Sequence, residues 1–293
     1  MSILDASTAT ELHDLSAMIR AHPRFGEVRN AYVNAGLKLY ENEPALNKLM
    51  LEAGRMMLFG VVLCLAAAHD DADRASWATV TRLQASLAAF GVASPRQVEL
   101  IVARLVQAGF LRLEAAPADR RARLVMPTQA LLDHDLDWLE ANFLPLHMMF
   151  PEPGYPLPMR RDPSFQKAQR IAALGLLPWA GRIMGENPPM LPFLRRYAGG
   201  LVLMKLIQAR ADTAPVGITF TDLGASFAVS RTHIRALLEE AEALALVELI
   251  GRGRRQVRLL PPLLAAYDQF TTDSMAAHEL THRMALEAIT DSR

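Results

Sequence analysis

Hydrophobic residues recur at helical spacing through most of this chain, and two short segments alternate with polar residues instead. The spacing predicts helices over residues 25–40, 44–69, 128–149, 192–211 and 262–291. The segments 44–69 and 192–211 are apolar on nearly all sides, so other helices must cover them. We expect both at the centre of the molecule, where they could lie against each other.

Alternating apolar and polar residues predict two antiparallel hairpins. The segment 111–114 alternates and is expected to pair with 121–126, and 247–250 is expected to pair with 255–260 across a Gly-Arg-Gly turn. The predicted fold class is therefore mostly α with small β wings.

One sequence pattern occurs twice in the chain. The hexapeptide Thr81–Ser86 recurs as Thr221–Ser226, and each copy is followed by a Ser that opens a helix, an apolar strand, an Arg-Arg pair and a second strand that ends at a proline. Repetition on this scale indicates a tandem duplication. We place the two units at residues 1–150 and 151–293, with a proline-rich linker over about 145–163. The chain is long enough for each unit to bury its own core.

The second copy has the pattern of a helix-turn-helix. Leu223, Ile234 and Leu237 fall where two short helices crossing at a tight turn would bury them, and Ser230 is placed to cap the second helix. The first turn of that helix is basic although positive side chains oppose the helix dipole there, which an external anion would explain. In a helix-turn-helix the first turn of the second helix faces base edges in the DNA major groove. The predicted contacts are therefore Arg231, Thr232, His233 and Arg235.

The first copy offers a similar helix, and both hairpins are rich in arginine. A capping box, Ser94-Pro95-Arg96-Gln97, opens the helix. Arginines in a hairpin beside such a helix suit phosphate or minor-groove contacts. The predicted DNA contacts are Arg96, Gln97 and Arg104 in the helix, Arg120, Arg121 and Arg123 in the first hairpin, and Arg252, Arg254, Arg255 and Arg258 in the second.

The segment Asp119–Thr128 resembles the wing of MarR-type winged helix-turn-helix transcriptional regulators, in which an Asp-x-Arg turn precedes a strand and a Thr that opens the next helix. Pro127 and Gly253 depart from that pattern. The resemblance covers one wing and the helix order of both copies. It implies dimer-type architecture, DNA binding through helix and wing with Arg121 in the minor groove and Asp119 orienting it, and often an aromatic small-molecule effector. Because both copies lie in one chain, an intramolecular pseudo-dimer could replace the usual homodimer.

Other motifs point to weaker alternatives. The segment His278–His282 spells the zinc-protease pattern H-E-x-x-H, but no third ligand follows at a known spacing. The acid-rich stretch 133–140 could bind a cation, although such stretches are usually solvated. Cys64 lies within an apolar helix, as a small buried hydrophobe does. We therefore predict no enzyme activity, no metal and no cofactor.

Charge and targeting signals limit the partners and the compartment. Formal net charge is zero, so DNA-binding charge must be concentrated locally. A single Cys and the lack of a signal-peptide pattern favour the cytoplasm, and the longest apolar run, 56–68, is shorter than the roughly 20 residues that span a bilayer. The sequence thus predicts a transcriptional regulator that binds an asymmetric, two-half-site operator in double-stranded DNA. The alternative is a non-enzymatic winged-helix module that binds protein, which zero net charge allows.

Overall fold

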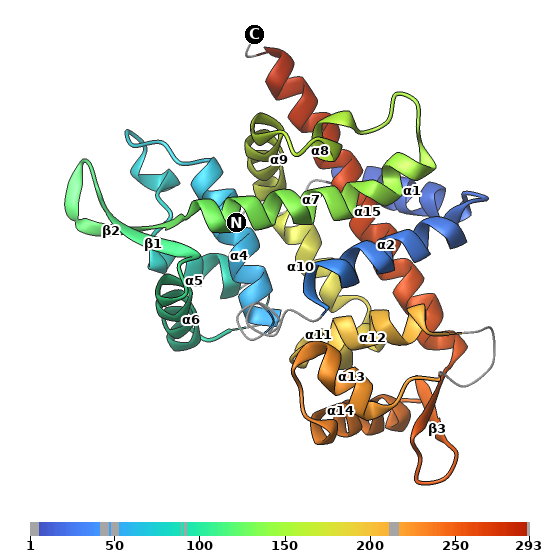
Figure 1. Ribbon diagram of the computed structural model, residues 1–293. Coiled ribbons are helices and arrows are strands. Elements are labelled where there is room, and N and C mark those ends of the chain that lie inside the picture. The colour runs from blue at the N-terminus through green and yellow to red at the C-terminus, as the bar shows by residue number, and fades with distance from the viewer. Residues whose placement is uncertain are drawn as a thin grey trace.

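The computed structural model describes residues 6–41, 47, 53–88, 90, 93–210 and 217–291. Within them the chain is mostly helical and has two separate two-stranded antiparallel sheets, which confirms the predicted mixture of helices and small hairpins. Figure 1 shows the two hairpins far apart, with long helices crossing between them.

The first half of the chain leads to the first hairpin and then to a long helix. Its elements are α1 (Ala6–Ala21), α2 (Phe25–Tyr40), α4 (Ala53–Ala67), η1 (Arg74–Ser76), α5 (Val80–Ala88), α6 (Pro95–Gln107), β1 (Leu111–Ala116), β2 (Asp119–Pro127) and α7 (Gln129–Met149). The predictions for 25–40 and 128–149 match α2 and α7 closely. The start of the predicted helix 44–69 lies largely outside the described residues, and α4 forms its remainder.

The second half contains more short helices. Its elements are α8 (Pro156–Met159), α9 (Pro163–Gly175), α10 (Leu177–Gly185), η2 (Pro188–Met190), α11 (Leu191–Arg195), α12 (Gly199–Gln208), α13 (Phe220–Phe227), α14 (Arg231–Ala243), β3 (Val247–Ile250), β4 (Gln256–Leu259) and α15 (Pro261–Asp291). The sequence α5–α6–β1–β2–α7 thus has the same order of elements as α13–α14–β3–β4–α15.

The predicted continuous helix over 192–211 is wrong, because the chain turns between α11 and α12. Ala198 takes a left-handed backbone conformation there, with φ of 56°. A Cβ at Gly199 would lie 2.3 Å from the carbonyl oxygen of Phe193, so only glycine allows the two backbone segments to pack this closely. Nor do the two apolar helices pack chiefly on each other: α4 packs on α9, and α12 packs on α2.

The proline-rich segment also differs from the predicted linker. Helix α7 continues through Pro145 to Met149, α8 follows at Pro156–Met159, and α9 begins at Pro163. Pro145 is buried, so its packing stabilises a helix that loses one backbone hydrogen bond at this position. Only short stretches around residues 150–155 and 160–162 lie outside helices.

Both large hydrophobic clusters contain residues from both halves of the chain. The first joins residues such as Val33 and Leu83 to Val202 and Leu223, and the second joins Leu12 and Phe143 to Phe165 and Met275. Helix α1 packs along α15 although the two lie near opposite ends of the sequence (Figure 1). The two halves therefore fold around shared cores.

Candidate nucleic-acid interface

Helix caps, a left-handed residue and a close backbone contact at a glycine hold α13 and α14 in a tight turn. Thr219 and Asp222 form a capping box at the start of α13, and Ser230 Oγ accepts a hydrogen bond from the backbone N–H of His233, at 3.1 Å, to cap α14. Between the helices Ala228 has a φ of 55°. A Cβ at Gly224 would lie 2.6 Å from the carbonyl oxygen of Val229, so the helix pair depends on a glycine here. Leu223, Ile234 and Leu237 are buried, as the pattern predicts.

The four predicted contacts at the start of α14 have different environments. Arg231 and Thr232 are exposed, and no described residue pairs with the Arg231 side chain. His233 instead turns inward, where its Nε2 lies 2.9 Å from the carbonyl oxygen of Tyr197. Arg235 is partly buried over the Phe220 ring and near Glu239, at 3.7 Å. Of the four, the structure therefore presents Arg231 and Thr232 to solvent without such partners.

The β3–β4 hairpin separates its arginines into two kinds. Its turn needs three residues with positive φ, Gly251, Gly253 and Arg254. Arg254 forms an ion pair with Glu242 of α14, and Arg258 pairs with Glu248 across the strands at 2.5 Å. By contrast, Arg252 and Arg255 are exposed and no described residue pairs with their side chains.

The acidic end of α14 is largely neutralised by these contacts. Glu239 lies near Arg235, Glu240 pairs with Arg196, and Glu242 pairs with Arg254. Glu242 also accepts a hydrogen bond from the backbone N–H of Leu249 at 3.0 Å, which ties the helix to the hairpin. The carboxylates are thus balanced, and the unpaired positive charge lies at the start of α14 and at the tip of the hairpin.

In the first unit, α6 presents a stripe of long side chains. Ser94 and Gln97 form the capping box that the sequence predicts, with the Gln97 side chain accepting from the Ser94 backbone N–H at 2.7 Å. This bond uses Gln97 Oε1, one of the two side-chain atoms that bidentate contact with an adenine would need. Arg96, Leu100 and Arg104 lie one turn apart, are exposed, and define the outer face of α6; Leu100 keeps 53% of its surface exposed.

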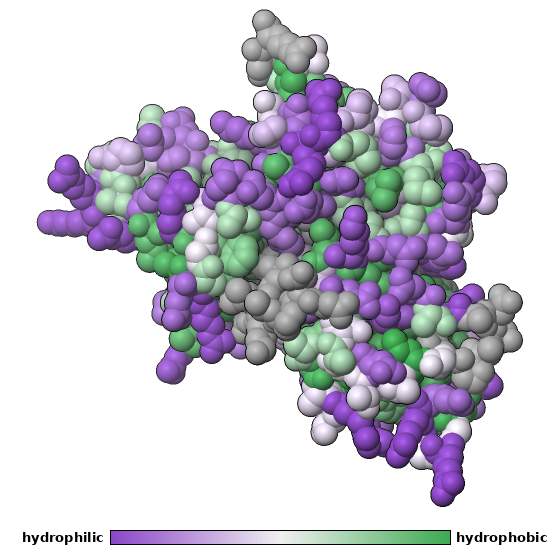
Figure 2. All heavy atoms as spheres, in the orientation of Figure 1, coloured by the Kyte–Doolittle hydropathy of each residue, from purple (hydrophilic) through white to green (hydrophobic). Residues whose placement is uncertain are grey.

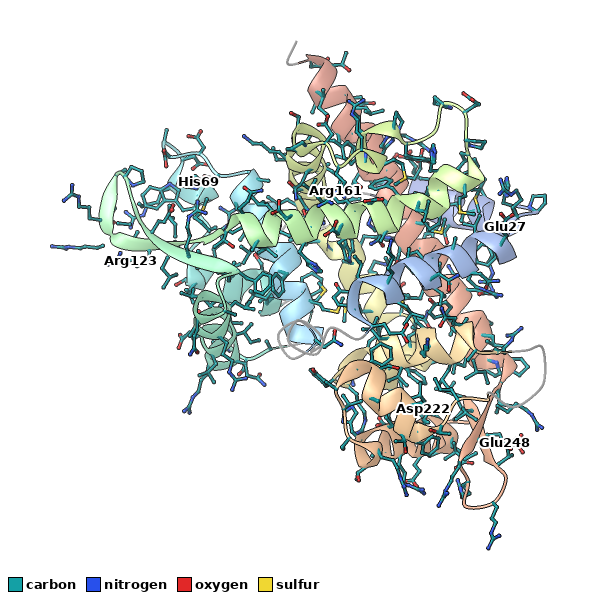
Figure 3. All side chains as sticks on the ribbon, in the orientation of Figure 1. Glu27, His69, Arg123, Arg161, Asp222 and Glu248 are labelled. Atoms are coloured by element: carbon teal, nitrogen blue, oxygen red, sulfur yellow. The ribbon has the colours of Figure 1, made fainter. Side chains whose placement is uncertain are left out.

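The β1–β2 hairpin extends from the body with its arginines outward. Arg120, Arg121 and Arg123 are exposed, and no described residue pairs with their side chains. Figure 3 shows Arg123 on this hairpin at the edge of the molecule, and Figure 2 shows hydrophilic surface at the ends of both hairpins. Asp119 accepts a hydrogen bond from the backbone N–H of Arg121 at 3.1 Å, while its other oxygen pairs with Arg74 at 3.1 Å. Asp119 therefore shapes the turn and does not contact the Arg121 guanidinium.

In the H-E-x-x-H pattern, His278 and Glu279 form hydrogen bonds, whereas His282 packs among aromatic rings. His278 Nδ1 lies 2.7 Å from the carbonyl oxygen of Ser274 and so donates to it, and Glu279 accepts from the Tyr155 hydroxyl and from Arg283. The His282 ring packs against that of Tyr155. In the part of the chain that the structure describes, no group of three or more His, Cys, Asp or Glu side chains is placed to hold a metal ion.

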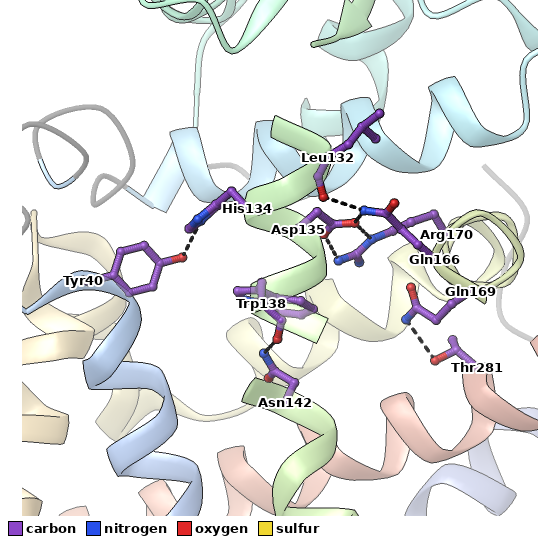
Figure 4. A network of polar contacts seen from close by, with 10 residues as sticks. All are labelled: Tyr40, Leu132, His134, Asp135, Trp138, Asn142, Gln166, Gln169, Arg170 and Thr281. Atoms are coloured by element: carbon purple, nitrogen blue, oxygen red, sulfur yellow. Dashed lines mark hydrogen bonds and ion pairs between the residues drawn. The ribbon is translucent and has the colours of Figure 1, made fainter. Parts of the chain in front are cut away.

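The acid-rich stretch of α7 contains an interaction that the sequence does not reveal. The acidic residues of this stretch have different partners. Asp137 pairs with Arg161, whereas Asp135 is buried against Arg170 of α9. Gln166 also donates to Asp135, at 2.8 Å, and His134 lies within 3.4 Å of the Tyr40 hydroxyl (Figure 4). In the sequence, this ion pair is indicated only by an Asp on the apolar side of α7. Its partner Arg170 lies 35 residues away in the other half, so no local pattern connects the two.

Comparison with known proteins finds no relative of this chain. No family model, no curated protein and no solved structure matches it. Among the described residues, no helix is both long enough and apolar enough to cross a membrane.

Proposed function

We propose that this protein is a DNA-binding transcriptional regulator built as a single-chain pseudo-dimer of two winged-helix units. One unit consists of α5, α6 and the β1–β2 hairpin, and the other of α13, α14 and the β3–β4 hairpin. In each, the second helix would enter the major groove while the hairpin contacts the backbone or minor groove. The recurring order of elements and the separation of the two units in Figure 1 support this arrangement.

The observation that carries the proposal is the set of exposed arginines at both units that have no partner in the described part of the chain. Arginines that hold the fold together have carboxylate partners, as Arg254 and Arg258 do. The remaining ones reach solvent and match the donors that DNA phosphates and base edges require. Those for which no described residue supplies a side-chain partner are Arg96, Arg104, Arg120, Arg121, Arg123, Arg231, Arg252 and Arg255.

The two helices carry different side chains, so the two half-sites should differ. The outer face of α6 places Leu100 between two arginines, where it could contact a thymine methyl group. The start of α14 presents Arg231 and Thr232 instead. We expect an asymmetric operator whose halves lie about one helical turn, roughly 34 Å, apart.

Binding of the purified protein to a random duplex library at two salt concentrations tests this function. Retained duplexes should carry a motif with two unlike halves, and retention should fall steeply at the higher salt concentration because phosphate contacts release counterions. A palindrome bound equally at both halves would contradict the asymmetric pseudo-dimer. Absence of any enriched motif together with salt-independent retention would remove the DNA-binding function.

A protein-binding module is the second candidate, and one observation favours it. Leu100 on α6 and Leu113 on β1 are large apolar side chains that remain 53% and 47% exposed. Exposed apolar side chains are common at surfaces that contact proteins. If the library shows no motif, replacing Leu100 with Ser should abolish binding of a partner protein while leaving the fold intact.

A further inference from the structure

A cavity of 430 Å³ lies where helices from the two halves meet. This volume is in the range of small-molecule sites. Its walls come from α2, α4 and α7 in the first half and from α9, α10, α11, α12 and α15 in the second, and they are mainly apolar. Representative lining residues are Leu39, Met57, Phe59, Trp138, Leu177 and Met204.

Two polar rings in this wall, those of Tyr32 and His278, are only partly buried by protein. Burial raises the pKa of Tyr32 to about 12, although a hydrogen bond to Ser274 lowers it, and burial lowers the pKa of His278 to about 4. Both side chains nevertheless keep part of their surface accessible. Since both line the cavity, we assign this accessible surface to the cavity.

The cavity wall offers hydrogen-bond acceptors that no described residue uses. His278 donates from Nδ1 to the Ser274 carbonyl, so in the neutral ring Nε2 is an acceptor, and no described residue bonds to it. Gln169 of α9 donates from Nε2 to Thr281 at 3.2 Å, while its Oε1 is buried without a partner (Figure 4). A buried acceptor without a donor costs about 1–3 kcal/mol, which a ligand hydroxyl or N–H would recover.

The charges in the wall are already balanced. Arg170 is paired with Asp135, and Arg196 is paired with Glu240. A charged ligand would therefore lose its hydration without gaining an unpaired partner among the described residues. The wall favours an uncharged molecule.

We propose that this cavity binds an uncharged, mainly apolar small molecule whose hydrogen-bond donor is held by Gln169 and His278. The cavity also connects the two units: α4 packs against α5 and α6, while α11 and α12 pack against α14 and α13. A ligand that spreads these helices changes the spacing of the two units, and so regulates operator binding. This regulatory role rests on the proposed function, whereas the ligand site does not.

Fluorescence of N-phenyl-1-naphthylamine tests the site directly, because this probe is uncharged, apolar and carries one N–H donor. Gly60 lines the cavity, and a Cβ added there meets no atom within 4 Å, so Gly60→Leu should fill the cavity from within α4. Gly26 in α2 is exposed, lies outside the cavity and is equally unobstructed, so Gly26→Leu is the matched control.

The full chain should bind the probe saturably at one site. Gly60→Leu should weaken binding at least tenfold, whereas Gly26→Leu should leave it unchanged. On the unaltered protein, the N-methylated probe, which lacks the donor, should bind several-fold more weakly than the parent probe. On a variant carrying both Gln169→Leu and His278→Phe, the two probes should bind with equal affinity. Unsaturable binding, or unchanged affinity in a folded Gly60→Leu protein, would overturn the site.

The DNA-library experiment separates this proposal from the proposed function. Probe binding without an enriched DNA motif would retain the ligand site and remove the regulator. An enriched motif without probe binding would retain the regulator and remove the ligand site. If both bind, saturating probe should change operator affinity at least threefold in the unaltered protein and have no effect in Gly60→Leu; an unchanged affinity in both would overturn the regulatory role.

Discussion

Asp135 on α7 and Arg170 on α9 form an ion pair buried between the two halves of the chain. Arg170 Nε lies 3.1 Å from Asp135 Oδ2, and the two side chains are only 9% and 3% exposed. Gln166 donates a further hydrogen bond to the carboxylate, and the Arg170 guanidinium lies 4.9 Å from the centre of the Trp138 ring. Both charges are therefore well satisfied, and each depends on the other.

Removing one member of this pair should destabilise the protein strongly. Asp135→Ala leaves the Arg170 charge buried without its partner, so the free energy of unfolding in urea should fall by about 3–5 kcal/mol. The matched control is Glu186→Ala, which breaks the exposed Arg182–Glu186 pair and should cost less than about 1 kcal/mol. Equal losses in the two variants would mean that the buried pair does not join the halves as described.

Under the proposed function, arginines that have no partner among the described residues should account for the salt dependence of DNA binding, and paired ones should not. The double variant Arg252→Ala, Arg255→Ala should reduce the slope of log affinity against log salt by about 2, because two phosphate contacts are lost. The double variant Arg254→Ala, Arg258→Ala removes the same charge from side chains paired with Glu242 and Glu248, and should change the slope less. The reverse order of effects would contradict the assignment of the contacts.

Gly224 should tolerate no side chain. In Gly224→Ala the new Cβ would meet the Val229 carbonyl oxygen, so we expect a loss of about 1–3 kcal/mol in the free energy of unfolding and, under the proposed function, weaker DNA binding by α14. Gly26→Ala, in an unobstructed helical position, should be neutral or stabilising by up to about 1 kcal/mol. Thermal unfolding of the two variants checks this, and an unaffected Gly224→Ala protein would show that the turn relaxes easily.

Stability should decrease as the pH falls below about 6.5. Burial lowers the pKa of His278 from 6.5 to about 4, so between these values the unfolded chain binds a proton that the folded chain does not. One such histidine contributes about 1.4 kcal/mol per pH unit to the slope. Burial also lowers the pKa of His134 and His282, so the unaltered protein should show a steeper slope than one residue gives.

The variant His278→Asn isolates the contribution of His278. Urea unfolding at pH 4.5, 5.5 and 6.5 should show a slope reduced by close to one proton compared with the unaltered protein. A slope identical in the two proteins would mean that His278 is protonated as readily in the folded state as in the unfolded state.

The single thiol of the chain should be unreactive in the folded protein. Burial raises the pKa of Cys64 to about 11, so only about a thousandth is thiolate at pH 8. Reaction with a chromogenic disulfide reagent should be at least 100-fold slower in the folded protein than in guanidinium. Comparable rates would show that the thiol is exposed by frequent opening of α4.

Local sequence patterns predicted two kinds of element: helices whose first residues supply hydrogen bonds to their own backbone N–H groups, and segments with one regular apolar face. The capping box at Ser94, the cap at Ser230 and the strand Val247–Ile250 follow from residues within a few positions of one another. The break at Ala198 was missed, because it depends on the contact between Gly199 and Phe193. Likewise, α9 contributes buried polar residues whose partners lie on other helices, so no local pattern marks them.

The sequence by itself determined the helix pairs α5–α6 and α13–α14, the hairpins that follow them and the positions of the arginines, since caps, turns and periodicity act over short distances. Only the tertiary structure decided which of those arginines have a carboxylate partner among the described residues, because Glu242 or Glu248 neutralises an arginine through spatial proximity. It also decided that the halves share their cores and meet at Asp135 and Arg170. Packing between distant segments depends on how well their shapes and charges match, and the hydrophobic pattern along one segment does not specify its partner.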